Sequence, residues 1–573
     1  MFLILSILFF GLHEAYAGLC PQVILHTEHK IKFTDTEKRM LCGDPAVDAY
    51  KNIPPYQAEI FMKGFLQSRG YLQPEFAPVG EVLNVYPRSK TFIRKMRVNI
   101  DEDKERKLVE KEIQRQYRKK LMTPKRLDAI EADALTVVRR RGFPCAKIET
   151  EAFPDTRSVD LNYKDLNWFP FGKIEKEKIP DLHENALARF YPFRESDAFN
   201  EMLLDLTEKR MMRAEVVSGT FFLENCSVDA RKFSLSQQFI IGPPRSIRFG
   251  AGVNTESGPM FRVKWAHNRF QPMASHLSAS FQASLRIQSL NLTADQYLWN
   301  HRPRQSLFSQ FDLIRESQFD YLQTLARLRP HMKWTEDKLR RHLIYTLGPT
   351  LEAGSFKSEE RLEQRSYRTG ALEGSISLMS HIYEYFDTHP EDGDTVRFSF
   401  DFRQPEFGFP HRLLKLDSTF AKLTRVGVWR RGNLIAGLRV NAATTIVPDS
   451  VDLLDLPPSV KFYGGGSDDV RGFLLRTLPK NDGLGALSKL GLKLELRRTY
   501  LWKESLEGFV FVDGARFGPE PWDIDPRVWY SPGVGLRWLS PIGMVQTYIA
   551  RARATNPDED FGNFYFIGLG GTF

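Results

Sequence analysis

The chain has 573 residues, more than one ordinary soluble domain needs, so we expect several structural units. Hydrophobic residues make up 42% and charged residues 26%, values typical of folded proteins that exclude a largely disordered chain. The formal net charge of +9 comes from scattered Lys and Arg without a polybasic block, and no nucleic-acid recognition module is present, so we exclude nucleic-acid binding.

Residues 1–17 have the pattern of a secretory signal peptide. An apolar run from Phe2 to Leu12 is followed by Ala15 and Ala17 on either side of Tyr16, the small-x-small arrangement of a cleavage site. After residue 17 there is no run of about 20 apolar residues, so we expect no transmembrane helix. Export without a membrane helix leaves the periplasm, the exterior or an outer-membrane barrel as the destination.

The chain has four cysteines, at Cys20, Cys42, Cys145 and Cys226. In an oxidising compartment Cys20 and Cys42 can pair near the N-terminus. The alternative is that all four are free and act as small buried hydrophobic residues. None of them has the spacing of a metal-ligand set, so we expect no metal site.

Residues 18–241 read as tandem α/β units. A helical pattern ends at Gly70, another at Gly142, and a third near Arg213, which gives a period of about 72 residues. A period of this size predicts repeated small domains. An unrelated α/β array is the alternative.

The middle unit shows the order of elements most clearly. A strand over Phe92–Val98 precedes a charged helix over Glu102–Leu121. A second helix begins after Thr123, an N-cap followed by proline, and two strands follow at about Ala146–Thr150 and Val159–Tyr163. The order strand, helix, helix, strand, strand resembles the POTRA (polypeptide-transport-associated) domain. The resemblance implies three copies, at 18–88, 89–166 and 167–241.

Residues 242–573 alternate with a period of two. In Leu277–Arg286 and in Lys489–Arg497 one parity is apolar, and the other is polar or small. Many such runs reach about 10 residues, the length that crosses a bilayer at a tilt, whereas strands of soluble proteins average about 5–6 residues. The pattern therefore predicts an antiparallel transmembrane β-barrel, with its apolar face toward lipid and its polar face toward a lumen.

We expect sixteen strands, an even number as in bacterial outer-membrane barrels. Their predicted centres lie near residues 250, 264, 282, 293, 312, 326, 347, 378, 399, 419, 439, 493, 511, 535, 548 and 567. Turns after even-numbered strands are short, as at Trp502–Ser505 and Ser540–Gly543, and the longest loop, about Val447–Leu487, follows the eleventh strand. With the N-terminal arm in the periplasm, this loop starts on the outer side. The terminal Phe573 resembles the C-terminal assembly signal of outer-membrane barrels.

Motifs in the last part of the chain make the resemblance more specific. The loop segment 462–473 resembles the sixth-loop motif of the BamA/TamA assembly-factor superfamily, through Val470, Arg471, Gly472 and Phe473. Phe511 and Asp513 resemble the strand-thirteen motif of that superfamily, although Ala515 stands where a second glycine is usual. Three POTRA-like units favour the TamA branch, whose members act in autotransporter assembly.

The resemblance implies that the loop folds into the barrel and that Arg471 meets Asp513. Phe511 and Asp513 share one parity, opposite to the flanking valines, so Asp513 faces the lumen if the valines face lipid. Glu495 lies on the lumen parity of the neighbouring strand. A guanidinium there has carboxylates for charge-assisted hydrogen bonds. The alternative is that Arg471 is a surface loop arginine.

Glycines occur on both the first and the last predicted strand, at Gly250, Gly252, Gly568, Gly570 and Gly571. Because glycine weakens a strand interior, we expect the pairing of these two strands to form the weakest seam of the barrel. A client strand can then pair at this lateral seam by β-augmentation. The alternative is that the glycines relieve crowding or permit curvature in a permanently closed barrel.

No catalytic set and no cofactor motif stands out, and the glycine run Gly464–Gly466 lacks the Gly-Lys-Ser/Thr and helix of a phosphate-binding loop. We therefore expect a non-enzymatic outer-membrane factor without cofactors that inserts or secretes outer-membrane proteins, with unfolded outer-membrane proteins as its clients. Resemblance to TamA implies a TamB-like partner anchored in the inner membrane. The alternatives are a secretion pore of the two-partner type, a passive porin or surface-binding barrel, and a periplasmic enzyme.

Overall fold

The computed structural model describes most of the chain, namely residues 16–27, 31–44, 46–47, 53–100, 103–227, 232–318, 321–358, 364–386, 389–409, 411–429, 432–448, 451–481, 483–503, 505–541, 543–555 and 560–569. The expected signal peptide up to residue 15 lies outside these residues, as do Gly570, Gly571 and Phe573. The chain divides into two compact units. The arm unit comprises Met1–Gly172, Glu195–Glu201 and Glu224–Ser234, and the barrel unit comprises Lys173–Arg194, Met202–Leu223 and Leu235–Phe573.

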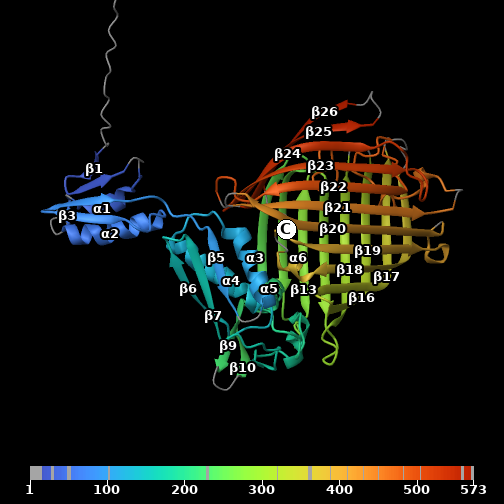
Figure 1. The fold of residues 1–573 in the computed structure, drawn as a ribbon. Helices are drawn as coiled ribbons and strands as arrows, with labels where there is room; N and C mark the ends of the chain where they lie inside the picture. The colour runs from blue at the N-terminus through green and yellow to red at the C-terminus, as the bar shows by residue number, and fades with distance from the viewer. Residues whose placement is uncertain are drawn as a thin grey trace, which may run out of the picture. The chain divides into compact units, whose positions relative to one another are not determined.

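The first α+β unit has two helices and a four-stranded sheet with the order β1-β2-β4-β3 (Figure 1). Strands β2 and β4 are parallel, because the two helices lie between them in the chain. The elements are β1 (Tyr16–Cys20), β2 (Val23–His26), α1 (Asp35–Cys42), α2 (Pro55–Ser68), β3 (Glu75–Val79) and β4 (Val82–Tyr86). Tyr16 and Ala17, which lie at the expected cleavage site, are the first residues of β1.

The second α+β unit has the predicted order of elements and the sheet order β5-β7-β6. Its elements are β5 (Lys95–Asn99), α3 (Asp103–Tyr117), α4 (Pro124–Arg139), β6 (Lys147–Phe153) and β7 (Ser158–Lys164). Thr123 caps α4 by accepting a hydrogen bond from the Arg126 amide, as expected. Gly142 follows α4 at φ +109°, and a Cβ there would meet the Trp168 ring at 2.2 Å, so only glycine fits.

The third α+β unit repeats the order with a shortened first helix. Its elements are β8 (Ile174–Lys176), the 3-10 helix η2 (Glu184–Phe190), α5 (Glu201–Arg213), β9 (Gly219–Ser227) and β10 (Lys232–Ile240). The sheet order β8-β10-β9, with β8 parallel to β10, repeats that of the second unit. All three units are consistent with the predicted POTRA repeats. No helix of the described residues is both long enough and apolar enough to cross a membrane.

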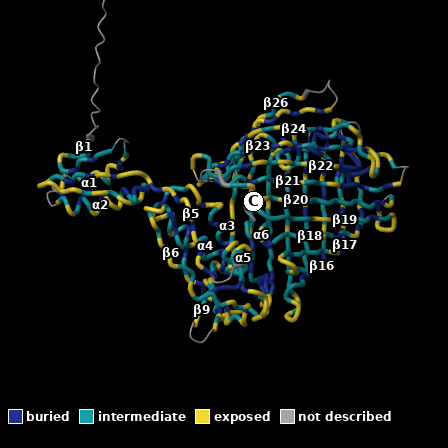
Figure 2. Tube along the Cα trace, in the orientation of Figure 1, coloured by how far each residue is buried: buried dark blue, intermediate teal, exposed yellow. Residues whose placement is uncertain are grey.

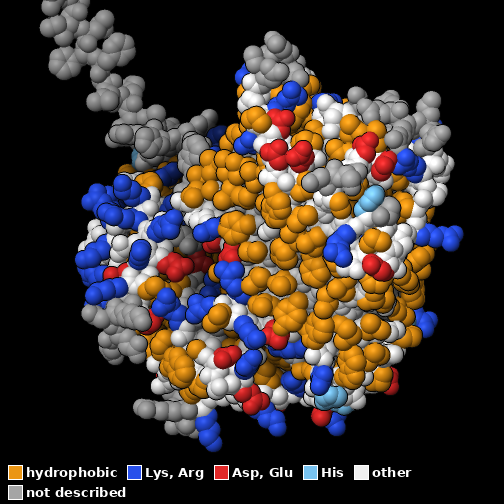
Figure 3. All heavy atoms as spheres, turned by 90° about the vertical axis from the view of Figure 1, so that its right-hand side faces the viewer, with side chains coloured by type: hydrophobic (Ala, Val, Ile, Leu, Met, Phe, Trp, Pro, Cys, Tyr) orange, Lys and Arg blue, Asp and Glu red, His pale blue; other side chains and the backbone are white. Residues whose placement is uncertain are grey.

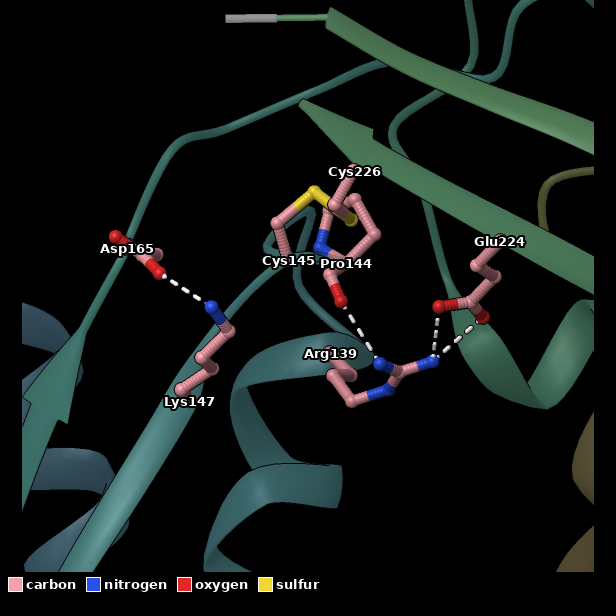
Figure 4. Close-up of a disulfide and its surroundings, with 7 residues drawn as sticks. All are labelled: Arg139, Pro144, Cys145, Lys147, Asp165, Glu224 and Cys226. Atoms are coloured by element: carbon pink, nitrogen blue, oxygen red, sulfur yellow. Dashed lines mark hydrogen bonds and ion pairs between the residues drawn. A yellow bond between two sulfur atoms is a disulfide. The ribbon is translucent and has the colours of Figure 1, made fainter. Parts of the chain in front are cut away.

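All four cysteines are paired. Cys20 is joined to Cys42, with Cα atoms 5.9 Å apart, and Cys145 to Cys226, with Cα atoms 5.7 Å apart. Figure 4 shows the second bond beside Arg139, whose guanidinium donates to both carboxylate oxygens of Glu224, at 2.5 and 2.6 Å. The alternative of four free thiols is therefore wrong, and the second disulfide was not predicted.

The C-terminal part of the barrel unit is a closed antiparallel barrel of sixteen strands, as the alternation predicts (Figure 1). The strands are β11 (Arg245–Asn254), β12 (Gly258–His267), β13 (His276–Ser284), β14 (Ile287–Gln296), β15 (Gln305–Ser317), β16 (Tyr321–Lys338), β17 (Arg341–Ser358), β18 (Arg365–Ser380), β19 (Gly393–Arg403), β20 (Leu413–Trp429), β21 (Gly432–Ile446), β22 (Ser488–Arg498), β23 (Leu506–Gly518), β24 (Trp529–Ser540), β25 (Gly543–Ala554) and β26 (Asp560–Leu569). Every predicted centre lies inside a different strand. The short helix α6 (His381–Tyr385) connects β18 to β19.

The outer face of the barrel is apolar and the inner face is polar. On β23 the outward Val510 and Val512 are about half exposed, while Phe511 and Asp513 between and beside them are buried in the lumen. Figure 2 shows how exposure changes along the strands, and Figure 3 shows hydrophobic side chains gathered over a wide part of one face. Because such a surface fits hydrocarbon and a closed barrel has no free edges, this is an outer-membrane type of barrel.

Candidate functional site: the lumenal loop and the lateral seam

The loop between β21 and β22 folds back into the barrel. Its backbone forms two isolated β-bridges, Phe462 with Ala486 and Gly464 with Leu478, so the loop has an ordered conformation of its own. Val470 and Phe473 are buried in an apolar cluster with residues of β23, β24 and β25. Gly472 has φ +99°, and a Cβ there would lie 2.3 Å from the Ser531 hydroxyl, so glycine lets the loop touch the β24 wall.

Arg471 fixes this loop to the wall formed by β22 and β23. Its Nε and Nη2 donate to the two carboxylate oxygens of Asp513 at 2.7 and 2.9 Å, and its backbone amide donates to the same carboxylate at 3.1 Å. Nη1 donates to Glu495 at 2.7 Å, and the guanidinium lies 3.6 Å from the Phe511 ring centroid. Asp513 is 0% exposed and Arg471 is 2% exposed. The structure therefore brings together four of the residues that the motifs singled out.

The carboxylate of Glu495 is shared between two arginines. Arg537 on β24 donates to its two oxygens at 2.8 and 3.0 Å, opposite the contact from Arg471. A buried ion pair is stable only when its remaining hydrogen-bonding capacity is satisfied, and here each carboxylate has two or more donors. Arg537 was not among the predicted residues. Its lumen parity was visible in the sequence, but nothing local indicates its partner.

A second arginine ties the same loop to a different part of the wall. Arg476 donates to Glu316 on β15 at 2.9 Å and to the Tyr321 hydroxyl on β16 at 2.6 Å. The loop tip also reaches the first hairpin, because the Ser467 hydroxyl donates to Glu256 at 3.1 Å. The loop therefore contacts both the strands near β11 and the strands opposite them.

The seam between β11 and β26 is described as far as Leu569. In the described residues only Val253 pairs with Leu569 and Asn254 with Gly568, while β11 pairs with β12 along its whole length. Among the predicted seam glycines, Gly568 lies in the paired part. Gly250 and Gly252 lie below it and have described partners only on β12.

A cavity of about 510 Å³ opens on the lumen side of the seam. Its wall combines β11 and β26 with the loop tip, β22 and β24, so it lies between the seam and the Arg471 contacts. Phe566 on β26 borders it and stacks on Tyr548 of β25, with ring centroids 4.8 Å apart. The seam, the cavity and the tethered loop thus form one continuous site.

A buried charge cluster lies at the opposite mouth of the barrel, where β11 begins. Arg210 of α5 donates to Asp337 at 2.7 and 3.1 Å and to Glu384 of α6 at 2.7 Å through each of two nitrogens. Burial opposes its charge, but the hydrogen bonds that Arg210 donates to Glu384 and Asp337 raise the pKa of Arg210 above its ordinary value. Asp337 also accepts from Arg304 at 3.2 Å. None of these residues was among the predicted site residues.

Together these features define an outer-membrane β-barrel with a loop tethered inside its lumen and a cavity beside that loop. Residues 387–573 match the Omp85 superfamily domain, in agreement with the motif resemblance. The resemblance to TamA in particular stays a prediction.

Solved structures of similar fold include BamA from Haemophilus ducreyi lacking POTRA domains 1–3. That structure is 14% identical, with a TM-score of 0.50 over 84% of this chain and 99% of that one. CdiB from Acinetobacter baumannii is 13% identical, with a TM-score of 0.47 over 84% of this chain and 90% of that one. CdiB from Escherichia coli is 12% identical, with a TM-score of 0.47 over 90% and 97%. At such identities, the BamA similarity concerns the fold alone.

Proposed function

We propose that this protein is an outer-membrane assembly factor that inserts or secretes other outer-membrane proteins through the seam between β11 and β26. The observation that carries the proposal is the loop that Arg471 tethers inside the lumen, next to the strands β11 and β26 that close the barrel.

Opening the seam would present the free edge of β11 to an incoming strand. An unpaired backbone N–H or C=O group in hydrocarbon costs several kcal/mol, roughly 2–7 kcal/mol on transfer scales. A client strand that adds to this edge satisfies those groups, so the bilayer itself favours templated pairing. Folding and binding energy then drive the process, which needs no nucleotide.

The tethered loop supports this mechanism by holding the wall beside the seam. Asp513 and Glu495 keep Arg471 on β22 and β23, while Ser467 reaches Glu256 at the top of the first hairpin. The loop occupies the lumen, which weighs against a passive porin. No observation on the described residues favours a two-partner secretion pore over the assembly factor.

We place the arm in the periplasm, where its α+β units would receive clients. Each sheet has an edge strand, β3, β6 or β9, that can accept an extended segment by β-augmentation. A TamB-like partner anchored in the inner membrane would use the same chemistry.

Depletion of the protein, followed by quantification of the outer-membrane proteome, tests the function. We expect a subset of barrel proteins or autotransporters to decline while other envelope proteins keep their levels. An unchanged set of barrel proteins, together with ion conductance by the purified protein, would contradict the proposal in favour of a porin.

A further inference from the structure

The second α+β unit carries the excess positive charge of the first two units. Residues 89–166 contain 20 Lys and Arg against 14 Asp and Glu, whereas residues 18–88 contain 8 of each. The cations of the second unit are spread along its sequence without a polybasic block. Folding can still bring such residues together, so their places in the structure decide whether they form a charged surface.

Three segments of this unit meet at one corner of its sheet. The backbone amide of Lys119 donates to the Ile93 carbonyl at 2.8 Å, and that of Arg94 donates to the Arg157 carbonyl, also at 2.8 Å. These hydrogen bonds bring the chain after α3 and the turn before β7 to the start of β5. The corner is therefore built from residues that lie far apart in the sequence.

Four cations at this corner, which we call the basic corner, are exposed and unpaired. They are Arg94, Lys95, Arg118 and Lys119. Within the described part of the chain, none of these side chains forms an ion pair or a hydrogen bond. Like charges gathered in this way repel one another. A surface that presents several negative charges would relieve this repulsion.

Two phenylalanines border the cations. Phe92 is 44% exposed, and Phe153 at the end of β6 is 42% exposed. Phe153 pairs with Ser158 on β7, and Ser158 pairs with Lys95 on β5, so Phe153 and Lys95 lie on the same face of the sheet. Exposed aromatic side chains beside Lys and Arg are typical of surfaces that bind the interface of a membrane.

The unpaired state of the four cations favours lipid headgroups over an acidic protein. Protein carboxylates are bound most strongly by guanidinium groups held in a fixed fork geometry, as Arg471 is held in the barrel. Within the described residues, no hydrogen bond fixes the side chains of the basic corner in this way. An anionic leaflet needs no fixed geometry, because its charges are mobile, and its interface accepts phenylalanine rings.

The size of the attraction selects the bilayer that holds the barrel. Each Lys or Arg near an anionic leaflet strengthens binding about fivefold, so the charge of four corresponds to a dissociation constant on the order of 1 mM. Protein at micromolar concentration would not bind a separate membrane at this affinity. Because the basic corner and the barrel belong to one chain, the effective concentration of the corner at the barrel's own bilayer is on the order of 1 mM.

We propose that the basic corner, together with Phe92 and Phe153, docks the second α+β unit on anionic phospholipid headgroups of the bilayer that holds the barrel. This contact goes beyond the proposed function, since it requires a barrel in a membrane but no opening of the seam.

The test uses the full-length protein in nanodiscs of phosphatidylcholine alone or of phosphatidylcholine mixed with phosphatidylglycerol. Ser89→Cys, at an exposed position five residues before Arg94, carries a fluorophore that lipids with a spin-labelled headgroup quench at short range. With phosphatidylglycerol we expect strong quenching, with about half of the molecules docked, and with phosphatidylcholine alone little quenching. High salt should remove the difference.

Removing three of the cations should release the unit. At about fivefold for each cation, the triple variant should lower the docked fraction from about one half to about one in a hundred. Its substitutions are Arg94→Gln, Lys95→Gln and Lys119→Gln. The matched control removes three exposed lysines of the first unit and should keep the quenching. Its substitutions are Lys32→Gln, Lys38→Gln and Lys63→Gln. Urea unfolding checks that both variants are folded.

The two rings are tested at constant charge. Phe92→Ser with Phe153→Ser removes the apolar part of the contact, so quenching with phosphatidylglycerol should decrease and the remainder should become more sensitive to salt. Unchanged quenching in this variant would contradict a role of the rings in docking.

Three results would overturn docking on the barrel's own bilayer. The first is equal quenching in both kinds of nanodisc, or an equal loss in the triple variant and its control. The second is binding of a polyglutamate peptide that raises the fluorophore anisotropy in the wild type but not in the triple variant, without any effect of lipid, which assigns the corner to an acidic protein. The third is co-flotation of phosphatidylcholine nanodiscs with phosphatidylglycerol vesicles, which assigns it to a second membrane. None of these results bears on the seam, which the outer-membrane proteome tests separately.

Discussion

The two sides of the barrel are built differently. Strands β11–β14 near the seam have 9 or 10 residues, and β26 has 10, whereas β16 and β17 on the opposite side have 18 each. The ladder of β17 with β18 runs from Arg341 to Phe356 without a break.

The difference in strand length indicates where the barrel can open. Each backbone hydrogen bond contributes about 0.5–1.5 kcal/mol net in water, and more in hydrocarbon, so a long ladder is held far more firmly than a short one. We therefore expect the long wall of β16 and β17 to act as a fixed frame, and the seam, which borders the shorter strands β11–β14, to open at a lower cost. The loop contacts both walls, Arg476 on the long one and Arg471 on the one near the seam.

The largest expected effect comes from closing the seam covalently. Asn254 of β11 and Gly568 of β26 are direct partners across the seam, so Asn254→Cys with Gly568→Cys can form a disulfide across it. We expect the oxidised protein to lose assembly of client barrels in proteoliposomes, and a reductant to restore it. The rate of client folding, followed by heat-modified gel mobility, is the measurement.

The long wall provides the matched control for the seam cross-link. Thr346 and Ser375 pair across β17 and β18, with their hydroxyl oxygens 2.8 Å apart, so Thr346→Cys with Ser375→Cys adds the same bond to the fixed frame. This variant should keep full activity when oxidised. Activity that survives both cross-links equally would sink the seam mechanism.

Removing the ion pair of Arg471 with Asp513 is expected to have the next largest effect. Arg471→Ala leaves the fully buried Asp513 without its main partner, and breaking a buried ion pair costs about 3–5 kcal/mol. The barrel should still fold, because its ladders do not depend on the loop, but assembly activity should fall. Urea unfolding and protease cleavage of the loop are the measurements.

Removing the contacts of Arg476 tests whether the two walls hold the loop for different purposes. Arg476→Ala removes the contact with Glu316 and Tyr321 on the long wall, at a cost of about 1–3 kcal/mol. We expect it to loosen the loop but to spare most of the activity. If Arg471→Ala and Arg476→Ala impair assembly to the same degree, anchoring near the seam has no special role.

A smaller effect is expected at the mouth of the barrel, where α5 is held by the long wall. Arg210→Met leaves Glu384 buried without its main donor, while Asp337 keeps Arg304, so the cost should be about 1–3 kcal/mol. Limited proteolysis of α5 should become faster. Adding Glu384→Gln removes the orphaned charge and should recover part of the loss. If the double variant is no more stable than Arg210→Met, Glu384 is not the group that carries the cost.

The barrel was predictable because its signal is local. Alternation within each strand is visible over about ten residues, so every strand centre and the position of the long loop followed from the sequence. The parity of Phe511 and Asp513 followed from the same alternation. The partner of Arg471 came from motif resemblance, since spacing alone gives no contact between residues 42 positions apart.

The features that were missed join distant residues without a periodic pattern. Cys145 and Cys226 are separated by 81 residues, and Arg210 and Asp337 by 127. No helix face or strand parity relates such positions, because the packing of one unit on another decides them. The role of Gly250 and Gly252 at the seam stays a prediction, because the chain after Leu569 lies outside the described residues.

The smallest expected effect concerns Glu256, in the turn between β11 and β12. Burial raises the pKa of Glu256 to about 7, although hydrogen bonds from Ser467 oppose the shift. The folded protein therefore binds a proton between pH 4.5 and about 7 that the unfolded chain has released, so stability falls as the pH rises through this window.

Glu256→Gln removes this proton and should flatten the pH dependence, with a gain of about 1 kcal/mol above pH 7. Urea midpoints at pH 5, 6 and 8 measure it. Glu520→Gln, in the outer turn between β23 and β24, controls for the loss of one carboxylate. Since Glu256 joins the loop tip to the first hairpin, its effect should disappear when Ser467→Ala has already cut that contact. Additive effects of the two substitutions would mean that the turn stabilises the seam independently of the loop.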